Sequence, residues 1–310
     1  MADAPPHAGC DTDLIVVGGG PAGCAAARMG ADLGLRSILI EPDKLCRNLY
    51  RIPVLNNVLG GHVSGSELAD VITAELTSTD LCRLELGSRV TELRVDDLRA
   101  SVTLDSGGRL SAPYAVVATG VDPLRPRAVS WITAPDDLAL PPIWRAGREA
   151  AEGRTLLVAG GDRPAGTFLR AHPTTNTRLL LVFAEPDAHK VEEIRDDPRV
   201  TLLPAEHLTL HGDESTITAD VVTRNGERLT VTADAAYVNL GNAPAPPPGD
   251  LVRGADGYCS PADQRPRVAV AGDLRSPRFQ RIMTALGSGS EAALRAYYLA
   301  AGVPSDRLTG

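Results

Sequence analysis

Cysteine is scarce in this 310-residue chain, and no two cysteines are spaced as Cys-x-x-Cys. The five that occur are odd in number and far apart in the sequence: Cys10, Cys24, Cys46, Cys82 and Cys259. Such spacing fits neither a disulfide framework nor the paired ligands of a structural zinc site. The sequence therefore argues against a disulfide-rich scaffold and predicts no metal site.

The chain also lacks a long apolar run and an excess of basic residues. Hydrophobic residues make up 43% of it, but nowhere do about 18 of them follow one another, as a membrane span requires. The N-terminal segment up to Asp13 is polar and partly acidic, unlike a secretory signal. A net charge of -8 disfavours binding to the phosphates of nucleic acids. We therefore expect a cytoplasmic protein with no membrane or nucleic-acid partner.

The first informative motif joins a strand, a glycine-rich turn and a helix. The apolar run Leu14–Val17 predicts a buried parallel strand, residues 18–23 read Gly-Gly-Gly-Pro-Ala-Gly, and a helical pattern follows. A second strand, Ser37–Ile40, ends in Glu41. A glycine-rich turn without a ligand is the alternative, but this order of elements is typical of dinucleotide-binding units. Glu41 is then expected to accept hydrogen bonds from the adenosine ribose hydroxyls.

Each residue of this turn has a predicted task. Gly18 makes the tight turn, Gly20 lets the backbone approach a pyrophosphate, and Gly23 lets the helix pack closely on the strand. Pro21 and Ala22 belong to the turn, and the N-terminus of the helix that follows, predicted over Cys24–Leu33, faces the anion.

Two later segments complete the pattern of an FAD site. The predicted strand Tyr114–Val117 leads into Ala118-Thr119-Gly120, and the strand 267–271 leads into Gly272-Asp273. Phe279, Gln280, Arg281 and Ile282 then open an amphipathic helix that runs to about Ala301. The positive end of that helix is expected to face the flavin pyrimidine ring.

Together these motifs resemble the low-molecular-weight thioredoxin reductases. Phe279-Gln280-Arg281 resembles the family's Tyr-Arg-Gln with the last two residues exchanged, and residues 57–60 (Asn-Val-Leu-Gly) resemble its Asn-x-Pro-Gly beside the flavin. The resemblance covers nearly the whole chain. It implies an α/β fold of two Rossmann-like dinucleotide-binding domains, the second inserted in the first, with FAD as cofactor and a homodimeric state. The expected FAD-binding domain comprises residues 1–121 and 246–310, and residues 122–245 form the degenerate NAD(P)H-binding-like domain.

The resemblance also implies a set of cofactor-binding residues, drawn from the motifs above. They are Gly18, Gly20, Pro21, Ala22, Gly23, Glu41, Asn57, Ala118, Thr119, Gly120, Gly272, Asp273, Phe279, Gln280, Arg281 and Ile282.

The dithiol of that family is missing. Residues 131–136 read Trp-Ile-Thr-Ala-Pro-Asp, where thioredoxin reductases carry Cys-x-x-Cys-Asp, so that Ile132 and Pro135 replace the two cysteines and Asp136 is retained. Neither replacement can form a thiolate or exchange a disulfide. The chain is therefore not expected to reduce disulfides through this pair.

The second nucleotide loop is also altered. It reads Ala-Gly-Gly-Asp-Arg-Pro over residues 159–164, and we predict that Ala159 replaces the turn glycine and Pro164 the small packing residue. The strand that follows ends near Glu185 and Asp187, acids that would repel a 2′-phosphate. These differences argue against NADPH binding. Two alternatives stay open: the loop could bind NADH, or it could still bind a nicotinamide dinucleotide despite its altered sequence.

Three residues are candidates for catalysis: Asn57, His62 and Cys46. Asn57 and His62 lie in or just after the segment that resembles the family's flavin-side motif. Cys46 stands where thioredoxin reductases have a glycine near the flavin. Its thiolate could be stabilised by Arg47 or Arg51, and the alternative is an inert loop cysteine.

We therefore predict an FAD-dependent oxidoreductase: an oxidase or dehydrogenase of a small-molecule or carrier-protein-bound intermediate in bacterial natural-product biosynthesis. One alternative is a ferredoxin- or flavodoxin-NAD(P) reductase, a type that resembles thioredoxin reductases without the dithiol and needs a working nicotinamide site. The other is a non-redox flavin-binding partner of a biosynthetic assembly line.

Overall fold

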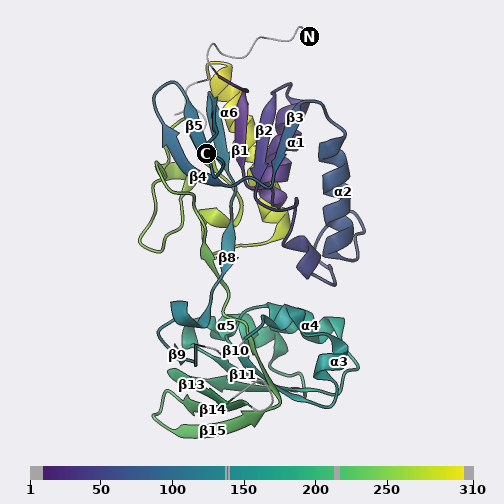
Figure 1. The fold of residues 1–310 in the computed structure, drawn as a ribbon. Helices are drawn as coiled ribbons and strands as arrows, with labels where there is room; N and C mark the ends of the chain where they lie inside the picture. Colours follow the sequence, from purple (N-terminus) through teal and green to yellow (C-terminus); the bar gives the residue numbers. More distant parts are fainter. Residues whose placement is uncertain (1–9, 137, 139, 213–216, 304–310) are drawn as a thin grey trace. The chain divides into compact units, whose positions relative to one another are not determined.

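The chain divides into two compact units. The computed structural model describes residues 10–136, 138, 140–212 and 217–303 (Figure 1). The first unit is formed from residues 1–50, 55–122 and 244–310, and the second from residues 51–54 and 123–243. The sequence expectation placed the two boundaries at 121/122 and 245/246.

A five-stranded parallel sheet is the centre of the first unit. Its strands, in spatial order, are β18 (Val268–Val270), β7 (Tyr114–Val117), β1 (Leu14–Val17), β2 (Ser37–Glu41) and β3 (Cys82–Leu86). All residues of β1, β2 and β7 are buried, as expected for central strands of a sheet covered on both faces. The helices of this unit are α1 (Pro21–Asp32), α2 (Gly65–Thr77) and α6 (Ile282–Ala300).

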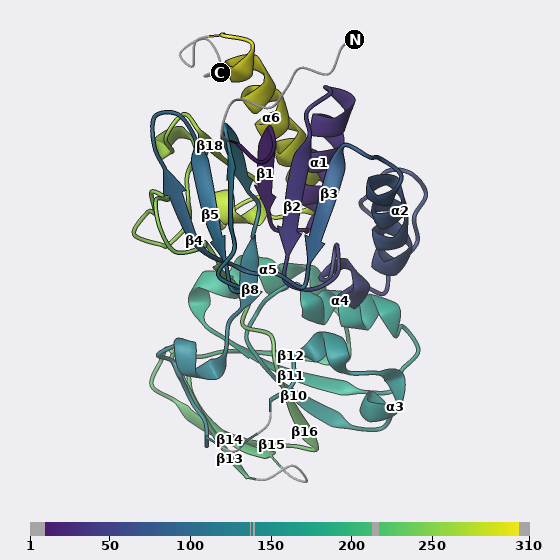
Figure 2. The ribbon, with the colours of Figure 1, turned by 45° about the horizontal axis from the view of Figure 1, so that its top comes forward.

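The sheet of the first unit is covered on one face by a smaller sheet and on the other by helices (Figure 2). The smaller, antiparallel sheet is formed by β4 (Val90–Val95), β5 (Ala100–Leu104) and β6 (Arg109–Ala112). Ile15 and Ile38 of the parallel sheet share a hydrophobic cluster with Leu93 and Val102 of the small one. Helices α1 and α6 pack together behind the parallel sheet (Figure 2).

Close packing of α1 and α6 depends on a glycine. A Cβ atom at Gly289 would lie 1.9 Å from the Ala22 carbonyl oxygen, a separation that no real contact allows. The backbone of α6 therefore rests directly on the first turn of α1.

The second unit contains a four-stranded parallel sheet and a separate four-stranded sheet. The parallel sheet has the order β12 (Val200–Pro204), β11 (Arg178–Phe183), β10 (Thr155–Ala159) and β16 (Ala235–Val238). The other consists of β15 (Arg228–Ala233), β14 (Ile217–Val222), β13 (His207–Gly212) and β9 (Ile132–Thr133). Strands β14 and β15 form an antiparallel pair, and Gly226 in the turn between them has φ of +77°. The Asn225-Gly226 pair in this turn is typical of β-hairpins.

The remaining elements are short. Helices α3 (Arg148–Ala151), α4 (Pro164–Ala171) and α5 (Ala188–Val191) belong to the second unit. Strand β8 (Val121–Pro123) pairs with β17 (Asn242–Pro244) where the chain passes between the units. Single 3₁₀ turns lie at Leu49–Arg51, Pro126–Ala128, Ile143–Arg145, Glu185–Asp187, Glu192–Ile194, Pro261–Asp263 and Gly272–Arg275.

The predicted fold class is confirmed, because each unit has a parallel sheet with a strand, a glycine turn and a helix at its centre. Within the described ranges, no helix has both the length and the apolar character needed to cross a membrane.

Two glycines of α6 offer a matched test of this packing. Gly289→Ala should lower the free energy of unfolding by about 2 kcal/mol or more, since its methyl group overlaps backbone. Gly287→Ala, where a Cβ meets nothing within 4 Å, should instead raise it by about 0.5–1 kcal/mol. Urea denaturation of both variants measures the difference, and equal effects at the two positions would contradict the packing.

Candidate functional site

The glycine turn of the first unit lies at the carboxyl end of β1. Gly18 has φ of +104°, and a Cβ there would lie 2.6 Å from the Ala118 carbonyl oxygen. Its N–H donates to the Ile40 carbonyl at 2.8 Å. The turn is therefore held between β2 and β7, and only glycine fits at its first position.

The turn leaves an open donor in front of α1. Within the described residues the Gly20 N–H has no hydrogen-bond partner, and a Cβ at Gly20 would meet nothing within 4 Å. Pro21 opens the helix without an N–H of its own, and Ala22 and Gly23 follow in the first turn. Free amides and the positive end of a 12-residue helix fit a pyrophosphate.

Glu41 ends β2 beside this turn. Its Oε2 accepts a hydrogen bond from the Gly19 N–H at 2.7 Å, and its Oε1 accepts one from the Asp43 N–H at 3.0 Å. The side chain is thus fixed in orientation, while each oxygen keeps a second lone pair for a ribose hydroxyl.

The Ala-Thr-Gly turn contributes an unsatisfied hydroxyl. Ala118 donates its N–H to the Val17 carbonyl, and the Gly120 carbonyl accepts from Ala245. Thr119 lies between them, and its Oγ1 is buried with no hydrogen-bond partner in the described structure. A buried hydroxyl without a partner indicates a position that a ligand completes.

Asp273 supplies a carboxylate at the end of β18. It follows Gly272, whose φ is +70° and whose N–H donates to Ser288 Oγ at 2.9 Å. Burial raises the pKa of Asp273 to about 6, and the positive charge of Arg281 opposes this shift. Its carboxylate accepts no hydrogen bond within the described residues, so the sugar-alcohol chain of FAD fits as its partner.

The residues before α6 differ from the expectation in detail. The helix begins at Ile282 and not at Phe279, because Phe279 has a left-handed φ of +60° that no helical residue adopts. Phe279 is 81% exposed. The Gln280 amide donates to the carbonyls of Asp273 and Ser276, and Arg281 is the N-cap residue of α6.

The arginine partners expected for Cys46 are engaged elsewhere. Arg47 lies 3.7 Å from Asp43 and 3.9 Å from Asp122, and the Arg51 guanidinium stacks 4.7 Å from the Trp144 ring. The Cys46 side chain is buried instead, with its sulfur 3.8 Å from that of Cys24. The arginine-stabilised thiolate at Cys46 stays a prediction.

The left-handed φ of Cys46, +53°, explains why glycine suits this position in the reductases that the chain resembles. Asn57 is exposed and His62 is half-buried. Neither side chain has a hydrogen bond or an ion pair to another described residue, and their catalytic roles stay predictions.

The second unit repeats the same turn, one residue later than the sequence indicated. Gly160 has φ of +112°, and a Cβ there would lie 2.3 Å from the Asn239 carbonyl oxygen. Its N–H donates to the Val182 carbonyl, as that of Gly18 does to Ile40. Gly160 is therefore the turn glycine, and the alignment that placed Ala159 there is wrong.

With Gly160 as the turn glycine, different positions of the second turn depart from the first turn than the sequence alignment indicated. Counting from Gly160, Asp162 occupies the place of Gly20 and Ala165 that of Gly23, so the small packing residue is retained. Strand pairing of Ala159 with Val182 puts Phe183 at the place of Glu41. Leu240 then occupies the position in the second unit that corresponds to Thr119 in the first. The pyrophosphate glycine, the ribose carboxylate and the buried hydroxyl are all replaced.

Asp162 and Asn239 also close the second loop internally. The Asp162 N–H donates to the Asn239 carbonyl at 3.1 Å, and the Asn239 side-chain amide donates to the carbonyls of Gly160 and Asp162. The Asp162 carboxylate pairs with Lys190 at 3.7 Å, and Lys190 pairs with Asp187 at 2.8 Å. Sequence reasoning missed Asn239 and Lys190, although the likeness of Asn239-Leu240-Gly241 to Ala118-Thr119-Gly120 was a usable signal.

The segment that replaces the dithiol is part of the second unit's core. Ile132 is buried and pairs with Leu208 in the parallel contact of β9 and β13. Asp136 is exposed and pairs with Arg127 at 3.0 Å. All five cysteines belong to the first unit, so the second unit has no thiol to take over this role.

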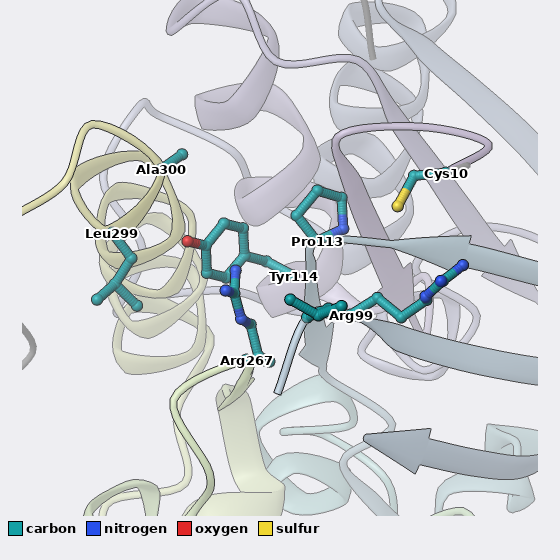
Figure 3. Close-up of a pocket in the computed structure, with 8 residues that line it drawn as sticks. Cys10, Arg99, Pro113, Tyr114, Arg267, Leu299 and Ala300 are labelled. Carbon is teal, nitrogen blue, oxygen red and sulfur yellow. The ribbon is translucent and has the colours of Figure 1, made fainter. Parts of the chain in front are cut away.

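A cavity of about 400 Å³ lies elsewhere in the first unit (Figure 3). Arg267 stacks 5.0 Å from the Tyr114 ring in its wall, and Leu299 of α6 closes one side. Tyr114 begins β7, whereas the Ala-Thr-Gly turn follows the end of that strand. The cavity is thus at the opposite end of β7 from the dinucleotide turn and is not part of it.

Gly20→Ala separates cofactor binding from folding. Gly20 has φ of -75°, and the added methyl group has open space, so the unfolding midpoint of the apoprotein should not change. FAD should bind at least about tenfold more weakly, a loss of about 1.4 kcal/mol, because the methyl group blocks the approach of the pyrophosphate. Fluorescence titration of apoprotein with FAD measures this loss. Gly18→Ala is the contrasting variant and should destabilise the fold itself, and unchanged FAD affinity in Gly20→Ala would contradict the assignment.

Asp273 should make the stability of the apoprotein depend on pH. The folded-state pKa of Asp273, about 6, exceeds the ordinary value of 3.8. The contribution of this carboxyl group to the free energy of unfolding is therefore complete below pH 3.8 and is lost as the pH rises to about 6. The free energy of unfolding of Asp273→Asn, relative to that of the wild type, should therefore rise by about 1–3 kcal/mol from pH 4 to pH 7.5. Urea denaturation at both pH values tests this, and a pH-independent difference would count against the buried carboxylate.

Comparison with known proteins finds several similar chains. Residues 12–129 match the model of the pyridine nucleotide-disulphide oxidoreductase family. Ferredoxin-NADP reductase from Granulibacter bethesdensis is 27% identical over 179 residues, which are 56% of this chain and 51% of that protein. One component of the alkyl hydroperoxide reductase of Staphylococcus aureus is 29% identical over 109 residues, 35% of this chain and 21% of that protein. The chain thus matches about half or less of the length of these relatives.

Solved structures extend the likeness to the whole fold. Thioredoxin reductase from Lactococcus lactis has a TM-score of 0.78 at 16% identity and covers 94% of this chain and 100% of its own. Thioredoxin reductase from T. acidophilum has a TM-score of 0.71 at 16% identity, and the match covers 94% of this chain and 99% of that one. Residues 12–129 thus match the pyridine nucleotide-disulphide oxidoreductase family, and the chain has the fold of thioredoxin reductases.

Proposed function

We propose that this flavoprotein is an oxidase or dehydrogenase that takes electrons directly from its substrate. The substrate is a small molecule or a carrier-protein-bound intermediate, of the kind handled in bacterial natural-product biosynthesis, and the protein acts as a homodimer. When bound, FAD supplies a two-electron acceptor that can pass electrons on to oxygen.

The observation that carries this proposal is the carboxylate of Asp162. It stands where a nicotinamide dinucleotide would place its pyrophosphate, in a loop whose N–H is already bonded to Asn239. Two like charges about 4 Å apart repel by about 4 kcal/mol at an effective dielectric constant of 20, and Lys190 offsets part of this. Together with Phe183 in place of the ribose carboxylate, the loop disfavours both NADH and NADPH.

The second support is the loss of the dithiol. Ile132 and Pro135 carry no thiol, and the second unit contains no cysteine. Electrons therefore do not pass through the pair that thioredoxin reductases use, and the substrate is the donor that remains.

A ferredoxin- or flavodoxin-dependent NAD(P) reductase is the second candidate. The 27% identity to a ferredoxin-NADP reductase favours it. This function requires a nicotinamide site, so the experiment that tests Asp162 also separates the two candidates.

Anaerobic titration with NADH and NADPH should leave the oxidised flavin absorption band unchanged at concentrations that reduce a thioredoxin reductase fully. Asp162→Gly removes the charge and restores the glycine of the turn. We expect it to bind NADH or NADPH at least about tenfold more tightly than the wild type, equivalent to about 1.4 kcal/mol. Calorimetry measures the affinity, and Asp187→Asn, which removes a neighbouring charge outside the turn, is the control for NADH, which lacks the 2′-phosphate that Asp187 would repel.

Rapid bleaching of the wild-type flavin by either nicotinamide would overturn the proposal and establish the reductase. If neither nicotinamide reacts, an anaerobic panel of small-molecule and carrier-bound thiols, alcohols and amines should contain a substrate that bleaches the band. A flavin inert to the entire panel would indicate a binding protein and not an oxidase.

A further inference from the structure

Two of the three buried cysteines of α1, β3 and the segment after β2 lie beside the dinucleotide turn. Cys24 lies on α1, Cys46 follows β2, and Cys82 begins β3. The sulfurs of Cys24 and Cys46 are 3.8 Å apart, although 22 positions separate them in the sequence. The tertiary fold thus creates a thiol pair that no local motif contains.

The pair is attached to the turn through Gly19. The Cys46 N–H donates to the Gly19 carbonyl at 2.7 Å, and the Cys24 thiol lies 3.3 Å from the same oxygen. The Gly19 N–H donates to Glu41, the carboxylate assigned to the ribose. A change at the sulfurs therefore reaches two groups that hold the cofactor.

One of the two cysteines lines a cavity. A space of about 360 Å³ is lined by residues of α1, α2 and α6, and Cys24 is among them. Arg28 and Glu75 lie in the same wall. A molecule of the size of hydrogen peroxide fits a space of this volume, which brings an oxidant next to the buried residue Cys24.

The Cys24 thiol is stabilised in its protonated form. The hydrogen bond to Cys46 and burial raise the pKa of Cys24 well above its ordinary value. Cys24 therefore stays a protonated thiol, 3.8 Å from the Cys46 sulfur, until an oxidant reaches the pair.

We propose that Cys24 and Cys46 are a redox-active thiol pair that a hydroperoxide converts to a disulfide. Two S–H bonds break and one S–S bond forms, and the two electrons and two protons reduce the peroxide to two molecules of water. Disulfide geometry brings the sulfurs to about 2.05 Å, which draws the segment after β2 toward α1. The Gly19 carbonyl loses its thiol donor, and the FAD affinity falls. This site is independent of the electron donor proposed above.

The experiment treats the FAD-loaded full-length protein with a stoichiometric amount of hydrogen peroxide. Free thiols are then counted after denaturation, and peptides are mapped without reduction. The expected result is a fall from five thiols to three, with a single cross-link between the peptides of Cys24 and Cys46. Oxidation should weaken FAD binding at least threefold, as measured by release of flavin fluorescence, and dithiothreitol should reverse both changes.

Three variants control the assignment. Cys24→Ser and Cys46→Gly should each abolish the cross-link and the change in FAD affinity, and glycine at position 46 suits the left-handed backbone there. Cys82→Ser removes another buried thiol of the same unit but leaves the pair intact, so it should behave as the wild type. Five free thiols after peroxide, a cross-link elsewhere, or an FAD affinity that does not respond to the disulfide would each overturn the proposal.

Discussion

The first unit depends on three backbone contacts too close for any side chain. Gly18 lies against the carbonyl of Ala118, Gly23 against that of Gly18, and Gly289 against that of Ala22. These contacts bring β1, β7, α1 and α6 together at the carboxyl end of the parallel sheet. The open amide of Gly20, the Thr119 hydroxyl and the Asp273 carboxylate lie at that same end, where the strands of such sheets place their ligands.

The two units show that the architecture of a nucleotide turn can persist after its chemistry has changed. Gly160 repeats the geometry of Gly18 almost atom for atom, with the same positive φ and the same approach to a strand-end carbonyl. The glycine that packs the turn is retained because any side chain there would overlap backbone. The position that contacts the pyrophosphate carries no such steric limit, and Asp162 occupies it together with Lys190. Packing and ligand binding are therefore separable requirements within one short loop.

The cysteines of the chain lie apart from the segment in which thioredoxin reductases carry their dithiol. The site of the missing dithiol became part of a hydrophobic core through Ile132, whereas the thiols that remain lie in the first unit. Cys24 and Cys46 touch Gly19 of the glycine turn, the loop proposed to bind the adenosine end of the cofactor. Any role they have in redox chemistry thus acts through the shape of the turn.

The sequence by itself determined the class of fold, the first nucleotide turn with Glu41 and the absence of the dithiol. Each depends on local order along the chain: strand, glycine turn, helix and terminal acid follow one another within about 30 residues, the length of one βαβ unit. Only the tertiary structure decided the register of the second turn, because the sequence pattern allows either Ala159 or Gly160 at its first position, whereas the close approach of Gly160 to the carbonyl of Asn239 requires glycine there. It also decided the partner of Cys46, since contacts between residues far apart in sequence arise from how α1 packs beside β2. The residues on either side of Cys46 therefore do not predict which side chain it contacts.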